Sequence, residues 1–117
     1  MDPYPIAKEE LLRAARSVVP GLSPREVVEQ QDSLVFKKGR IVTFNDQVFC
    51  RAPSGLPKDF PTIVVKAKKF IGQLGRLPDS EVKLSVEDKV LVVTGKRRKL
   101  RFRGETEVLL PIDTLTI

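Results

Sequence analysis

Lysine and arginine are the residues of this sequence whose number and spacing best suit a chemical role, which is the binding of an anionic partner. The chain of 117 residues carries 21 lysines and arginines against 15 acidic residues, a formal net charge of +6. An excess of this size favours an anionic partner, and nucleic acid is the first candidate. The densest run is segment 96–103, KRRKLRFR, with six basic residues and no acid.

Residues suited to catalysis are scarce. The sequence has no histidine and a single cysteine, Cys50, which excludes Ser-His-Asp and Cys-His catalysis and a zinc site built from Cys and His. The acidic residues form short groups at predicted turns and strand ends, and no glycine-rich phosphate loop is present. We therefore expect no enzyme, no metal and no cofactor. This disfavours the enzymatic alternative, a small metal-dependent nuclease.

The length predicts one domain over residues 1–117. No apolar run approaches the roughly 20 residues that cross a bilayer, and the N-terminus lacks the pattern of a signal peptide. A lone cysteine cannot form a disulfide within the chain, and we expect Cys50 to be a packing residue in a reducing cytoplasm. The expected location is therefore cytoplasmic.

Hydrophobic periodicity predicts two similar halves, about 1–56 and 57–117. Apolar residues from Leu11 to Val19 recur at helical spacing, which predicts an amphipathic helix over 6–19 that ends at Pro20. The two prolines of MDPYPI argue against a strand before this helix. The other predicted elements are strands 33–38, 40–45, 47–52 and 62–66, helix 67–77, and strands 81–87, 89–95 and 99–104.

Each half thus contains a helix followed by three strands, and a Pro/Gly-rich connector, 53–61, lies between the halves. Phe36 and Val86 occupy matching positions before matching turns. This order predicts an α+β domain of two pseudo-symmetric halves, with two helices side by side on antiparallel sheet.

The exposed faces of the two predicted helices are basic and carry no large hydrophobic residue. Such a surface can contact phosphates without reading bases, although a solvated helix face would have the same composition. Gly72 leaves room for close approach, whereas Gly75 is expected only to loosen the helix end. The candidate binding residues are Arg13, Arg16, Arg25, Lys68, Lys69, Gln73 and Arg76.

Strand alternation separates the residues of segment 96–103. Lys99, Arg101 and Arg103 alternate with inward-facing hydrophobic residues, so we expect them on a solvated or subunit-contacting sheet face. Nearby acids could pair with them across strands; these are Glu81, Glu87, Glu105 and Glu107. In the alternative interpretation, the chain is a stand-alone basic nucleic-acid-binding α+β protein whose main surface is segment 96–103.

Two segments of this sequence resemble one domain of the bacterial sliding clamp, the β subunit of DNA polymerase III. KEELLRAARSVVPGLSPR resembles the first helix and following loop of that family. VVKAKKFIGQLGRLPDSEVKLSVEDKVLVVTGKRRKLRF resembles its pattern of strand, helix, LP turn and paired strands. The resemblance covers nearly the whole chain and is stronger in the second half.

The resemblance implies a function without catalysis. Sliding clamps are rings of six such domains that encircle duplex DNA, with helices lining the hole, and tether the polymerase for processivity. The implied partners are double-stranded DNA, a DNA polymerase, a clamp loader, and further clamp domains or copies of the chain. Arg25 and Lys68 fall on family positions that face DNA.

The chain also departs from the family. A clamp subunit has three such domains and a peptide-binding pocket mainly in its last domain, whereas this chain has one domain. It is therefore expected to be a fragment of a longer clamp or a reduced, phage-like relative that assembles from several copies. The apolar end, LLPIDTLTI, favours the fragment.

Overall fold

A computed structural model describes residues 3–22, 30, 32–45 and 48–107. Its elements, in chain order, are β1 (Tyr4–Ala7), α1 (Lys8–Ser17), the 3₁₀ turn η1 (Val19–Gly21), β2 (Ser33–Lys37), β3 (Arg40–Phe44), β4 (Phe49–Pro53), β5 (Ile63–Lys66), α2 (Ala67–Gly75), β6 (Glu81–Glu87), β7 (Val90–Thr94) and β8 (Lys99–Arg103).

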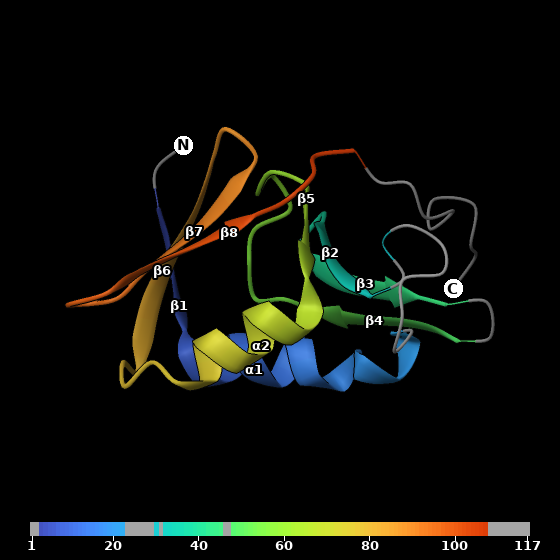
Figure 1. Cartoon of the computed structure of the whole chain (residues 1–117), viewed down its shortest axis with the longest axis horizontal. Helices are drawn as coiled ribbons and strands as arrows, with labels where there is room; N and C mark the ends of the chain where they lie inside the picture. Colours follow the sequence, from blue (N-terminus) through green and yellow to red (C-terminus); the bar gives the residue numbers. More distant parts are fainter. Residues whose placement is uncertain (1–2, 23–29, 31, 46–47, 108–117) are drawn as a thin grey trace.

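The strands form two four-stranded antiparallel sheets, in the orders β1-β6-β7-β8 and β4-β3-β2-β5. The two helices lie side by side along one side of both sheets (Figure 1). The predicted α+β class and the adjacent helices are therefore confirmed.

The two halves exchange a strand, which the sequence patterns did not indicate. Strand β1 of the first half pairs with β6, and strand β5 of the second half pairs with β2. Each sheet thus combines three strands of one half with one strand of the other. Because each half completes the other's sheet, the predicted halves 1–56 and 57–117 are not separate packing units.

The N-terminal segment forms a strand, so the prediction from its prolines that no strand precedes the first helix is wrong. Residues 4–7 form β1, with Ile6 opposite Val82, and α1 begins at Lys8 rather than at residue 6. Proline is tolerated here because β1 is an edge strand, where a missing backbone donor need not interrupt a ladder. Ile6 is buried in the core, so its apolar character belongs to the sheet and not to the helix.

Matching hydrogen bonds start the two helices. The backbone N–H of Lys8 donates to the carbonyl of Ser80 (3.0 Å), and that of Ala67 donates to the carbonyl of Asp32 (3.2 Å). Neither helix has a side-chain N-cap, so in each case the start of a neighbouring strand satisfies one of the free helix donors. These two junctions support the predicted pseudo-symmetry.

Three phenylalanines connect the helix layer with both sheets. Phe70 of α2 is fully buried, and its ring contacts Phe36 of β2 and Phe102 of β8. The main core extends around these rings and includes the inward residues of both helices. The core therefore holds α2 in one orientation, with its opposite side exposed.

Candidate nucleic-acid interface

The exposed side of α2 carries the residues that the sequence placed there. Lys68, Lys69 and Arg76 are exposed and Gln73 is half-buried, whereas the core side of the helix is buried. Arg76 is the C-cap residue immediately after the helix. The orientation of α2 that was predicted from its hydrophobic spacing is therefore confirmed.

Helix α1 has the same arrangement. Arg13 and Arg16 are exposed, and the intervening Ala14 and Ala15 are buried. Arg25, the remaining predicted residue, lies outside the described residues. The structure thus brings six of the seven predicted residues onto the exposed sides of two neighbouring helices.

Of the two glycines of α2, Gly72 has the open surroundings expected of it, whereas Gly75 does not simply end the helix. A Cβ at Gly75 would lie 3.7 Å from Nη2 of Arg16 and 4.0 Å from Cδ2 of Leu12, which is ordinary van der Waals contact. A Cβ at Gly72 would have no atom of another residue within 4 Å. Gly75 is therefore the glycine beside the neighbouring helix, and Arg16 reaches this end of α2. Gly72 faces open space.

The predicted cationic residues of the two helices form no ion pair with another described residue. Ion pairs between described residues join Lys8 to Glu9 and Lys66 to Asp32. Lys8 also donates from Nζ to the carbonyl of Leu77 (2.8 Å) just beyond α2, where a cation is favoured. Lysine and arginine side chains without an ion pair can contact phosphates without first breaking one.

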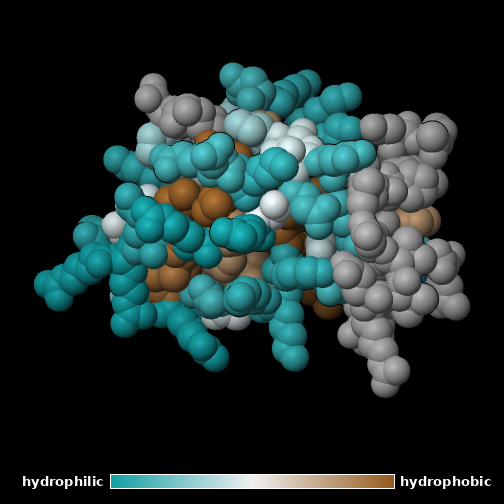
Figure 2. Space-filling view, turned by 45° about the horizontal axis from the view of Figure 1, so that its top comes forward, coloured by the Kyte–Doolittle hydropathy of each residue, from teal (hydrophilic) through white to brown (hydrophobic). Residues whose placement is uncertain are grey.

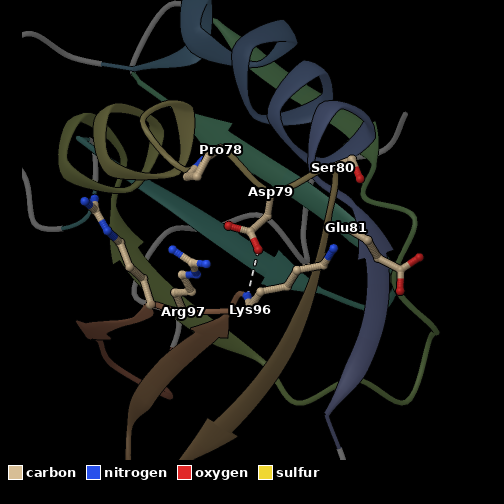
Figure 3. Close-up of a pocket in the computed structure, with 7 residues that line it drawn as sticks. Pro78, Asp79, Ser80, Glu81, Lys96 and Arg97 are labelled. Carbon is tan, nitrogen blue, oxygen red and sulfur yellow. Dashed lines mark hydrogen bonds between the residues drawn. The ribbon is translucent and has the colours of Figure 1, made fainter.

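The basic segment 96–103 is divided between two surfaces. Lys99, Arg101 and Arg103 are exposed on β8, an edge strand, while Phe102 is buried. This confirms the predicted alternation. The remaining three basic residues, Lys96, Arg97 and Arg98, form the tip of the β7–β8 hairpin, beside the loop between α2 and β6 (Figure 3).

The expected pairing of β8 with acidic residues is wrong. The residues opposite Lys99, Arg101 and Arg103 in β7 are Thr94, Val92 and Val90, because β7 lies between β8 and the acids of β6. Glu105 instead forms a bridge with Val64 of β5. The error arose because closeness in sequence does not fix the order of strands.

The described part of one face of the molecule is largely hydrophilic. Figure 2 shows polar side chains over most of one face, with a smaller hydrophobic area between them, and long polar side chains at the end where the β7–β8 hairpin lies in Figure 1.

Among the described residues, no group of three metal-ligating side chains occurs, and none of the described helices is long and apolar enough to cross a membrane. Cys50 is half-buried and packs against the core.

No protein-family model and no curated protein matches this sequence. Solved structures do match the fold. A DNA polymerase III β subunit from Eubacterium rectale aligns with a TM-score of 0.79 and 15% identity, over 98% of this chain and 32% of that chain. The corresponding protein from Streptococcus pneumoniae gives 0.75 and 19%, over 95% and 33%.

A sliding clamp from Pseudomonas aeruginosa bound to griselimycin gives a TM-score of 0.70 and 19% identity, over 98% of this chain and 32% of that chain. The chain thus spans about a third of the length of the clamp chains that it matches. It has the fold of one domain of the bacterial sliding clamps, the β subunits of DNA polymerase III.

Proposed function

We propose that this chain is a non-catalytic domain of a DNA sliding clamp. In this function it forms part of a ring around duplex DNA and tethers the replicative polymerase for processivity. The observation that carries the proposal is the position of Arg13, Arg16, Lys68, Lys69 and Arg76 on the exposed sides of adjacent helices, in a fold shared with clamp domains.

The chemistry of this surface fits a ligand that must slide. Lysine and arginine contacts to phosphate give affinity that is independent of base sequence and weakens with salt. Base-specific recognition would require side chains positioned against base edges in a groove. Long, exposed cationic side chains beside Gly72, which leaves open space over α2, favour shifting contacts with the backbone.

The proposed partners follow from the ring. A Helicobacter pylori β clamp has been solved with a DNA ligase peptide, so clamps of this fold bind other replication proteins. We extend this to the present chain as part of a ring that meets a DNA polymerase and a clamp loader at the replisome, in the cytoplasm. The remaining domains of the ring would be further clamp domains or copies of this chain.

The contact surface can be tested with the chain itself. In an NMR titration of the ¹⁵N-labelled chain with two short duplexes of unrelated sequence, amide shifts should map to the exposed sides of α1 and α2. The two duplexes should give the same map. Shifts confined to residues 99–103 of β8 would instead support the stand-alone nucleic-acid-binding protein.

Encirclement has a separate test. A ring assembled with this chain should stay on a nicked circular plasmid during gel filtration at about 0.15 M salt, where non-specific phosphate contacts alone give only weak binding. Cutting the plasmid once should release it. If retention is equal on circular and linear DNA and disappears with salt, direct phosphate binding explains the affinity and the chain does not encircle DNA.

A further inference from the structure

The tip of the β7–β8 hairpin, defined here as Lys96, Arg97 and Arg98, is the most concentrated charge that the proposed helix surface leaves unused. All three side chains are exposed. They lie beyond the strand alternation that directs Lys99, Arg101 and Arg103 to the outer sheet face, so the outer-face interpretation does not apply to them.

The hairpin tip is fixed against the loop that follows α2. Oδ2 of Asp79 accepts a hydrogen bond from the backbone N–H of Lys96 (2.7 Å), and the N–H of Gly95 donates to the carbonyl of Arg98 (2.8 Å). A Cβ at Gly95 would lie 2.9 Å from the Asp79 carboxylate, so the backbone approaches this carboxylate closely. The tip is therefore held beside a loop residue, Asp79, that follows Arg76 closely in the sequence.

The contact leaves a pocket of about 550 Å³ between the hairpin tip and residues 78–81, the end of the loop and the start of β6. In Figure 3 the side chain of Lys96 extends toward Glu81, whereas Arg97 lies on the side of α2. Asp79 already accepts the backbone hydrogen bond of Lys96. The pocket is thus open, and its lining carries three basic and two acidic side chains.

We propose that the hairpin tip is a second phosphate-contacting site, which continues the cationic surface of the helices beyond Arg76. This inference rests on the proposed function and adds residues that the helix surface does not include. Arginine suits the role because its planar guanidinium can donate two hydrogen bonds to one phosphate. The sheet and the Asp79 contact hold the backbone of the tip, so only the side chains need ordering.

The composition of the tip favours DNA over a protein partner. Protein interfaces are usually centred on buried aromatic or large apolar residues. The exposed large hydrophobic residues in the described part of the chain are Tyr4, Val19 and Val48, and none belongs to the hairpin tip. The basic side chains there form no ion pair with another described residue.

The test compares two double variants of the full chain that remove the same charge. Arg97→Ser with Arg98→Ser alters the hairpin tip, and Arg101→Ser with Arg103→Ser alters the outer face of β8. Binding to a fluorescent duplex is measured by anisotropy over a range of salt. Removal of one phosphate contact should reduce the slope of log K against log salt by about 0.9.

We expect the slope of the tip variant to fall by the equivalent of about one to two phosphate contacts, while the outer-face variant keeps the slope of the parent chain. An equal reduction in both variants would mean that only net charge matters, and an unchanged tip variant would also overturn the proposal. If the tip variant binds DNA normally but changes its self-association in sedimentation, the hairpin tip is a protein contact and the proposal is wrong.

The same assay separates this inference from the proposed function. Lys69→Ser with Arg76→Ser removes two charges from the helix surface. If this variant weakens DNA binding and the tip variant does not, the result supports the helix surface as the DNA contact and rejects the hairpin tip as a second site. Folding of every variant is checked by the dispersion of its NMR spectrum, and all of the substituted side chains are exposed.

Discussion

The ring of Phe70 in α2 lies edge-on to the ring of Phe36 in β2, with centroids 5.4 Å apart and an interplanar angle of 69°. Phe70 also lies 5.0 Å from the ring of Phe102 in β8. Since β2 and β8 belong to different sheets, a single helix residue joins both sheets to the helix layer. The orientation of the candidate interface therefore depends on this aromatic contact.

Phe70→Ala should lower the free energy of unfolding by about 3–5 kcal/mol, the usual loss for a buried phenylalanine with its cavity. Urea unfolding followed by circular dichroism measures this. Ile71→Ala is the matched control, because Ile71 is next in the helix but only half-buried, and it should lose clearly less. Equal losses would show that the aromatic contact has no special weight in the core.

The two-residue turns of the two halves predict a substitution that increases the stability of the chain. Lys38 and Gly39 have φ of 51° and 77°, and Asp88 and Lys89 have φ of 51° and 64°. A non-glycine residue in this region costs about 1–2 kcal/mol, against about 0.4–1 kcal/mol for the added freedom of glycine when unfolded. Lys89→Gly should therefore stabilise the chain by about 0.5 kcal/mol, the difference between these two effects.

Thermal or urea unfolding of Lys89→Gly tests this gain. Gly39→Ala is the reciprocal control and should destabilise the chain, because its φ is positive and its Cβ would lie 3.1 Å from the carbonyl oxygen of Leu56. A loss of stability in Lys89→Gly would contradict the backbone argument and indicate that the lysine side chain contributes to the folded state.

Local sequence patterns were sufficient for both helices and for strands β2 to β8, but not for β1 or for the pairing of the strands. The alternation of Val82, Leu84 and Val86 marked β6 with its observed bounds, because one face of that strand is buried. The pairing of β1 with β6 joins residues more than 70 positions apart, and no local period carries that information. The strand β1 itself was not predicted, because its prolines argue against a strand.

The candidate site was predictable to a similar degree. Helical spacing assigned Lys69 and Arg76 to an exposed face, since the opposite residues are apolar. The neighbourhood of Arg16 and Gly75 depends on how two helices pack, and the position of Arg97 depends on where a hairpin ends. Both depend on tertiary structure. The only sequence signal for the position of Arg97 was the unbroken run of basic residues in segment 96–103.

The Asp79 contact predicts a local change in dynamics. A hydrogen bond to a charged group contributes about 1.5–3 kcal/mol, so Asp79→Ala should accelerate exchange of the Lys96 amide by about tenfold or more when local opening limits exchange. Amide exchange by NMR measures this at single residues. Asp59→Ala alters an exposed acid elsewhere on the chain and should leave exchange of the Lys96 amide unchanged. The same protection in both variants would show that Asp79 does not hold the hairpin.

Charge reversal distinguishes the two basic surfaces of this chain most directly. Lys69→Glu with Arg76→Glu replaces two cations on the exposed side and at the C-terminal end of α2. Lys83→Glu with Arg101→Glu makes the same change in charge on exposed residues of the outer sheet face. Under the clamp proposal, the helix pair should weaken duplex binding by about tenfold or more at low salt, because two phosphate contacts become repulsive. Anisotropy at low salt measures both variants. The strand pair should change binding only through net charge, and a larger loss there than in the helix pair would mean that DNA binds the sheet side of the domain.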